Sequence, residues 1–201
     1  MIMHWKHSAF VVSLALVWAG LTVCAASAAA SSESATSTAK TNPSASVMTD
    51  SEFAKAAAQG GLAEVKLGEL AENKATNNTV KELGQRMVDD HTKADESLKT
   101  AASQDNISTP AEMDAKDQAT YDRLSKLSGT AFDRAYARVM VRDHVADIAA
   151  FRHEANNGKD ASIKTFAAQT LPTLQEHLKL ARQALRTVSP NANAQAEKKQ
   201  S

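Results

Sequence analysis

The chain has 201 residues, with 23 basic and 23 acidic side chains, six histidines and one cysteine. This length provides one domain of medium size plus its ends. Because the charges balance and no basic stripe occurs, the composition argues against nucleic-acid binding. Aromatic residues make up 4% of the chain, and both tryptophans, Trp5 and Trp18, precede the domain, which disfavours a stacking platform for bases or sugars.

Residues 1–30 have the layout of a secretory signal peptide. Lys6 gives a weakly basic start, an apolar run extends over residues 9–23, and small residues follow, as exported proteins require. The apolar run is short for a membrane span. We therefore expect a periplasmic or secreted protein, cleaved after Ala28 or Ala30. An uncleaved membrane anchor is the alternative interpretation.

Cys24 is the only cysteine. The segment 21–24 faintly resembles a lipoprotein cleavage box, although Val23 occupies the position where a small residue is expected. A lipid anchor at Cys24 is therefore a minor alternative to a soluble exported protein. With cleavage after Ala28 or later, the mature chain contains no cysteine and forms no disulfide.

The mature chain divides into three parts. Residues 31–48 are rich in Ser, Ala and Thr and predict a flexible linker. Residues 188–201 are polar and predict a disordered tail. Between them, residues 49–187 show apolar positions with a helical period, which predicts an all-α domain without a transmembrane segment.

Capping and stop signals divide this domain into helices. The predicted helices extend over residues 49–76, 79–103, 110–127, 130–157 and 160–187. The expected N-caps are Thr49, Thr79, Thr109, Thr130 and Asp160. Pro172 lies inside the last helix and is expected to kink it or to free the Ala168 carbonyl. Two helical hairpins joined by a helical crossover, between the second and third long helices, predict a ferritin-like four-helix bundle.

Four polar residues interrupt the apolar stripes, one in each long helix. They are Glu64, His91, His144 and His177. An unpaired buried polar group costs about 1–3 kcal/mol, so these groups must satisfy each other or bind a metal ion or water. Their positions along the helices place the first three at similar heights, whereas His177 is offset by about 7 Å.

Two interpretations of this layer remain open. Imidazole and carboxylate ligands suit one transition-metal ion, such as zinc, iron, copper or nickel. A hydrogen-bonded or water-filled layer that only sets the helix register is the alternative. A dinuclear carboxylate centre requires Glu-x-x-His motifs, which this sequence lacks, and no Cys-x-x-Cys-His motif predicts haem. No nucleotide-binding loop and no catalytic residues are recognisable.

Several neighbouring residues are expected to have structural roles. Helical geometry places the acids that precede the three histidines about 100° away from them, where they cap or face solvent. Asp133 is expected to cap its own helix, Tyr136 to lie in the core with its hydroxyl bonded, and His153 to be exposed. The Gly60-Gly61 pair predicts a close helix approach or a local bulge beside Glu64.

A combined pattern extends over residues 51–185: Phe53, Gly60-Gly61, Glu64, Met87-Val88-x-Asp90-His91, Phe132-Asp133-x-x-Tyr136, His144 and Leu171-Pro172-x-Leu174-x-x-His177-Leu178. It resembles a bacterial, secreted, ferritin-like family catalogued as a domain of unknown function, four-one-four-two. The resemblance implies a ferritin-like fold and export to the envelope, without an established activity. It also implies that the recurrent Glu and His positions of the family are Glu64, His91, His144 and His177.

Three functional hypotheses follow. The first is a periplasmic bundle that binds one transition-metal ion in metal handling or stress protection. The second is a metal-free structural or envelope-stress protein, and the third is a redox enzyme with an open metal position. The sequence identifies neither a reaction nor a partner, and it leaves a homo-oligomer open.

The leader generates a prediction about the mature protein. We expect its N-terminus to lie between Ala29 and Ser31, because the apolar run ends in small residues. The intact mass of untagged protein from the periplasm measures this. A retained leader, or a diacylglycerol mass on Cys24, would contradict a soluble exported protein.

Overall fold

A computed structural model describes residues 48–189, so the predicted leader, most of the linker and the tail beyond Ser189 lie outside it. The described part consists of five helices and contains no strand, which confirms the all-α class. The helices are α1 (Asp50–Lys74), α2 (Asn78–Gln104), α3 (Ala115–Ser125), α4 (Gly129–Asn157) and α5 (Ala161–Val188). Among the described residues, no helix combines the length and apolarity needed to cross a membrane.

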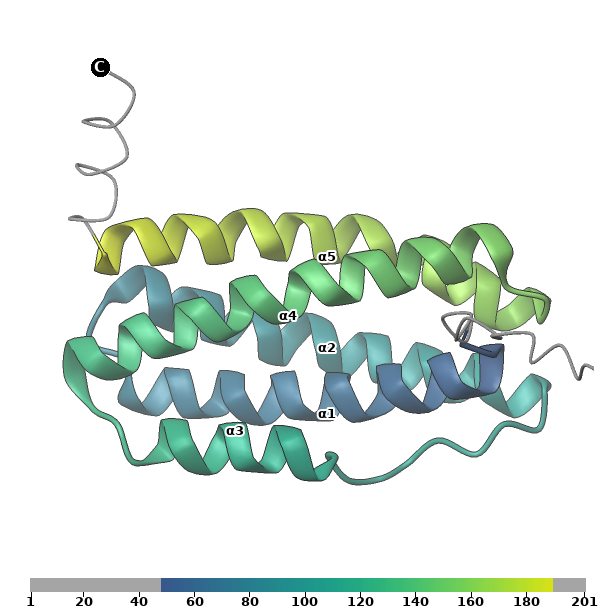
Figure 1. The fold of residues 1–201 in the computed structure, drawn as a ribbon, viewed down its shortest axis with the longest axis horizontal. Helices are drawn as coiled ribbons and strands as arrows, with labels where there is room; N and C mark the ends of the chain where they lie inside the picture. The colour runs from purple at the N-terminus through teal and green to yellow at the C-terminus, as the bar shows by residue number, and fades with distance from the viewer. Residues whose placement is uncertain (1–47, 190–201) are drawn as a thin grey trace, which may run out of the picture. The chain divides into compact units, whose positions relative to one another are not determined.

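The four long helices form a bundle. Helix α1 packs along α2, α4 packs along α5, and the two pairs meet through α2 with α5 and α1 with α4. The segment between α2 and α4 returns along the bundle and carries α3, so α2 and α4 run in the same direction (Figure 1). The finer assignment to the ferritin-like folds stays a prediction.

Several predicted helix boundaries are correct. Thr49 Oγ1 accepts a hydrogen bond from the backbone N–H of Glu52 at 3.3 Å, and Glu52 Oε2 accepts one from the N–H of Thr49 at 2.8 Å. This is the expected capping box. Helix α4 ends before Gly158, and Asp160 is the N-cap of α5.

Two predicted N-caps are wrong because an Asn or Asp side chain caps instead. Asn77, rather than Thr79, caps α2, and its Oδ1 accepts from the N–H of Thr79 at 3.0 Å. In the crossover, Asp114 rather than Thr109 is the N-cap, and its Oδ1 accepts from the N–H of Asp117 at 2.7 Å. The crossover helix is therefore shorter than predicted, with 11 residues.

Asp133 does not cap its own helix. Helix α4 begins after Ser128 instead of after Thr130. The buried Asp133 carboxylate reaches the α1–α2 turn, where it accepts from Thr76 N at 3.1 Å, Thr76 Oγ1 at 2.6 Å and Asn77 N at 3.0 Å. Because charge-assisted hydrogen bonds are strong, Asp133 ties this turn to α4.

The close approach of α1 to α2 occurs at Gly68 and Gly84. A Cβ atom on Gly84 would lie 2.8 Å from the Ala71 Cβ and 2.9 Å from the Gly68 carbonyl oxygen. The two helix backbones therefore touch here, and not at Gly60 and Gly61 as the sequence suggested.

The core divides into two apolar clusters. The Tyr136 cluster comprises Leu67, Leu70, Ala71, Val80, Leu83, Met87, Leu124, Phe132, Tyr136, Ala137, Val139, Met140, Ala181, Ala184 and Val188. The Phe151 cluster comprises Phe53, Ala54, Ala58, Leu98, Ala101, Ala102, Ile148, Phe151, Ile163, Phe166, Ala167 and Leu174. Along each long helix, the predicted polar residue separates one cluster from the other.

The helix crossing generates a prediction about stability. We expect Gly84→Ala to lower the free energy of unfolding by about 1–3 kcal/mol, because its methyl group overpacks the contact with α1. Gly60→Ala is the matched control, because a Cβ there meets no atom within 4 Å; the gain in helix propensity should stabilise by up to about 1 kcal/mol. Urea unfolding followed by circular dichroism measures both. Equal effects of the two substitutions would contradict the close contact.

Candidate metal centre

The four polar residues predicted from the sequence meet in the middle of the bundle. Glu64, His91, His144 and His177 come from four different helices and are 5%, 6%, 0% and 1% exposed. The three imidazole centroids lie 5.3–5.8 Å apart. The expected offset of His177 is wrong, because its Nδ1 lies 3.2 Å from the Nε2 of His144.

A chain of contacts connects the two innermost histidines to fixed acceptors. His144 Nδ1 lies 3.0 Å from the carbonyl oxygen of Met140, and His177 Nε2 lies 2.9 Å from Asp90 Oδ2. Arg86 pairs with the same Asp90 oxygen at 2.9 Å. The expectation that Asp90 caps or faces solvent is therefore wrong, because its carboxylate turns toward α5 and orients His177.

The number of protons on the His144 and His177 rings determines what must lie between them. The Met140 carbonyl and the Asp90 carboxylate only accept hydrogen bonds, so they place protons on His144 Nδ1 and His177 Nε2. Two neutral imidazoles carry only these two protons. His144 Nε2 and His177 Nδ1 then direct their lone pairs at each other across 3.2 Å. A third proton or a metal ion is needed between them.

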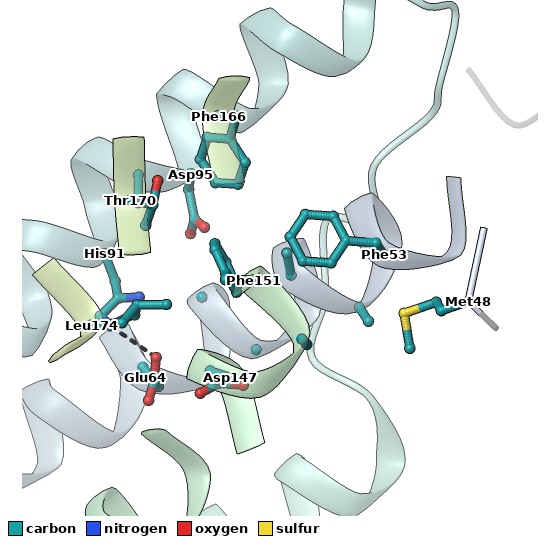
Figure 2. Close-up of a pocket in the computed structure, with 16 residues that line it drawn as sticks. Met48, Phe53, Glu64, His91, Asp95, Asp147, Phe151, Phe166, Thr170 and Leu174 are labelled. Carbon is teal, nitrogen blue, oxygen red and sulfur yellow. Dashed lines mark ion pairs between the residues drawn. The ribbon is translucent and has the colours of Figure 1, made fainter. Parts of the chain in front are cut away.

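Glu64 and His91 complete the layer as an ion pair. His91 Nε2 lies 2.8 Å from Glu64 Oε2, and His144 Nδ1 lies 3.2 Å from Glu64 Oε1 (Figure 2 draws the first contact). Apart from these ion-pair contacts, His91 Nε2 and Glu64 Oε1 are buried without a hydrogen-bond partner. Such atoms are rare in folded proteins, and a metal ion or a water molecule in the layer could satisfy them.

Electrostatics favour an anionic Glu64 beside neutral or cationic imidazoles. Burial raises the pKa of Glu64, but the nearby His144 and His91 outweigh it and lower this pKa to about 2. Burial lowers the pKa of His91, but Glu64 outweighs burial and raises it above its usual value. Burial lowers the pKa of His177 to about 4, although the hydrogen bond that His177 donates to Asp90 acts in the opposite direction. At neutral pH an extra proton on His177 is therefore disfavoured.

A cavity of about 80 Å³ reaches the layer at Glu64 and His91. The side chains of Asp95, Asp147 and Phe151 also line it (Figure 2). Sequence reasoning missed both aspartates. Their spacing contained a signal, because a residue three or four positions after a buried histidine lies on the same helix face.

Burial raises the pKa of both aspartates. Burial is the main cause that raises the pKa of Asp147 to about 8, and Glu64 and Asp143 raise it further. Burial likewise raises the pKa of Asp95 to about 6. Both carboxylates therefore lie where a cation would favour their ionised form.

Two groups of side chains could hold a metal ion. The first consists of His91, His144 and His177, and the second of Glu64, His144 and Asp147; within each group the ligand atoms lie within 4.8 Å of one another. Three imidazoles with one carboxylate suit a four- or five-coordinate transition metal.

Some of the remaining expectations are confirmed, and one is wrong. His153 is exposed, as predicted. Asp143 and Glu176 pair with Arg142 and Lys179 on the surface, which also agrees. Tyr136 is fully buried in the core, but its hydroxyl has no hydrogen-bond partner. The expected bond of this hydroxyl is therefore wrong, because no acceptor in the described residues reaches it.

Gly61 has a role at this site. A Cβ atom on Gly61 would lie 2.1 Å from Asp95 Oδ1, so the glycine makes room for the Asp95 carboxylate against α1. Helix α1 passes through Gly60 and Gly61 without interruption, and the expected bulge is absent there.

Comparison with known proteins identifies a family. The family model described as "Domain of unknown function (DUF4142)" matches residues 32–184, about three quarters of the chain. The chain therefore belongs to this family, in agreement with the resemblance seen in the sequence. No curated protein and no solved structure matches it significantly.

The contact between Gly61 and Asp95 generates a prediction. We expect Gly61→Ala to destabilise the protein by about 1–3 kcal/mol, because the new methyl group collides with the carboxylate. In an Asp95→Ala background the same change should be neutral or stabilising by up to about 1 kcal/mol, because only the helix propensity remains. A double-mutant cycle measured by urea unfolding tests this. An identical cost in both backgrounds would show that Asp95 does not require the glycine.

Proposed function

We propose that this member of the DUF4142 family is an exported, ferritin-like bundle that binds one transition-metal ion in the layer between its long helices. The facing nitrogens of His144 and His177 carry the proposal. A tetrahedral ion with metal–nitrogen bonds of about 2.0–2.1 Å separates two ligand nitrogens by about 3.3 Å. The two nitrogens lie 3.2 Å apart.

The outer partners of the two imidazoles support this proposal. Histidines that bind a metal ion commonly donate their other N–H group to a carbonyl or carboxylate, which fixes the tautomer and the ring orientation. Met140 supplies the carbonyl for His144, and Asp90 supplies the carboxylate for His177. Both rings are thereby held with a lone pair directed at the same point.

His91 and Glu64 are the candidates for the remaining ligands. His91 Nε2 and Glu64 Oε1 have no hydrogen-bond partner although both are buried. The charge of Glu64 would offset part of the charge of a divalent ion. Zinc, iron, copper and nickel all suit this mixture of ligands, and the corresponding role is metal handling or stress protection in the cell envelope.

A second candidate is a metal-free bundle in which the layer sets the helix register. The chain from Asp90 through His177 to His144 supports it, because these contacts already join α2, α5 and α4. A third proton on the histidine pair would then replace the metal ion. The two candidates differ in whether metal stabilises the protein.

We expect a saturating metal ion to raise the melting temperature of the wild-type chain. Binding at a hundred times the dissociation constant adds about 2.7 kcal/mol to the stability of the folded state, or roughly 5–10 °C for a domain of this size. His177→Gln should lose this shift, since it removes one ligand. Thermal unfolding with zinc, iron(II), copper and nickel measures it.

His153→Gln is the matched control, because His153 is an exposed histidine outside the layer, and it should retain the full shift. Elemental analysis of untagged protein from the periplasm should give about one metal ion per chain. The absence of a metal-dependent shift in the wild-type chain would contradict the metal centre. A shift that survives in His177→Gln would place the metal elsewhere.

A further inference from the structure

Two aspartates line the cavity beside the layer, and a sealed polar layer would not need them. We infer that it is the access route by which a divalent metal ion reaches the histidines, with Asp147 and Asp95 as transient docking ligands along the way. This inference rests on the proposed metal centre.

The cavity extends from the surface to the layer. Met48, which is 43% exposed, and Phe53 lie at one side of it, and Glu64 with His91 lie at the opposite side (Figure 2). His144 and His177 do not line it. An ion that enters from the Met48 side therefore meets Glu64 and His91 before the other two histidines.

An unpartnered ligand atom lies at the inner end. Glu64 is 5% exposed, it lines the cavity, and its Oε1 has no hydrogen-bond partner. Its close contact is with His144 Nδ1 at 3.2 Å, and the proton of that nitrogen is shared with the Met140 carbonyl. A buried carboxylate oxygen without its own hydrogen-bond donor is costly, and a cation arriving through the cavity would relieve this cost. The inner end of the cavity therefore offers a carboxylate oxygen to a cation.

The walls carry two carboxyl groups without a lysine or arginine beside them. Asp147 on α4 and Asp95 on α2 line the cavity, and neither forms a hydrogen bond or salt bridge with another described residue. No lysine or arginine lines it. Carboxylates in a confined cleft attract cations and raise their local concentration. Apart from Thr170, the remaining walls are mainly apolar.

Two glycines of α1 keep the route open. Gly60 lines the cavity, and a Cβ atom there would meet nothing within 4 Å. Gly61 makes room for the Asp95 carboxylate. Each glycine costs about 1 kcal/mol of helix propensity relative to alanine. The open space at Gly60 and the Asp95 carboxylate beside Gly61 provide a functional reason for this cost.

A route residue and a metal ligand differ in their kinetic effect. Blocking a route slows association and dissociation by the same factor, because the bound state is unchanged, and the dissociation constant stays constant. Removing a ligand raises the dissociation constant, mainly through faster dissociation. Rates measured together with affinity therefore separate these two roles.

The experiment uses Co²⁺ alone as the probe, followed by stopped-flow absorption on the full-length mature chain. We expect Gly60→Phe to fill the cavity and to slow both association and dissociation at least tenfold, with Kd within twofold of wild type. Asp147→Asn should slow association about three- to tenfold, because it removes a carboxyl ligand from the route. Gly60→Leu, a smaller plug, should have the same effect to a lesser degree, and it serves if the phenylalanine variant does not fold.

Two matched controls lie outside the cavity. Gln59→Phe adds the same side chain at the preceding position of α1, and Asp143→Asn removes a charge one turn before Asp147 on α4; neither residue lines the cavity. Both should bind Co²⁺ at the wild-type rate.

The outcomes distinguish this inference from the proposed function. Wild-type rates in both Gly60→Leu and Asp147→Asn would overturn the access route while leaving the metal centre intact. A raised Kd with unchanged association in Asp147→Asn would make Asp147 a permanent ligand and would overturn its role in transit. If the wild-type chain bound no Co²⁺ at all, the metal centre itself would be overturned, and the route with it.

Discussion

The burial of four polar side chains at the middle of a helical bundle is the constraint on which the rest of the structure depends. Glu64, His91, His144 and His177 lie between two apolar clusters. Left unsatisfied, such groups would cost on the order of 4–12 kcal/mol together, as much as the whole stability of a typical domain. The contact of His144 with the Met140 carbonyl and the contacts within the layer reduce this cost.

Precise helix placement is what lets these residues meet. The backbone contact at Gly68 and Gly84 sets the distance between α1 and α2 close to Glu64 and His91. Asp133 fixes the α1–α2 turn to the start of α4 through three donors. Because packed helices transmit small displacements, these contacts outside the layer determine whether its nitrogen and oxygen atoms share one point.

The layer is not closed on all sides, because a cavity reaches it at Glu64 and His91. A layer that only sets the register is best when every polar atom has a partner and water is excluded. Here Glu64 Oε1 and His91 Nε2 lack partners, and a cavity with Asp95 and Asp147 leads to them. The proposed metal centre accounts for both features, whereas a purely structural layer accounts for neither.

The sequence by itself determined the local features: the all-α class, the caps at Thr49 and Asp160, and the four polar positions, because helical period and capping depend on neighbours along the chain. Only the tertiary structure decided where the acids point. The helical period predicts that Asp90 caps or faces solvent, whereas its carboxylate contacts His177, and Asp95 and Asp147 line the cavity. The direction of a carboxylate is set by the helix packed against it: α5 offers His177 to Asp90, and α1 offers the space at Gly61 to Asp95. Spacing within one helix places Asp95 on the same face as His91, but it does not show which helix packs against that face.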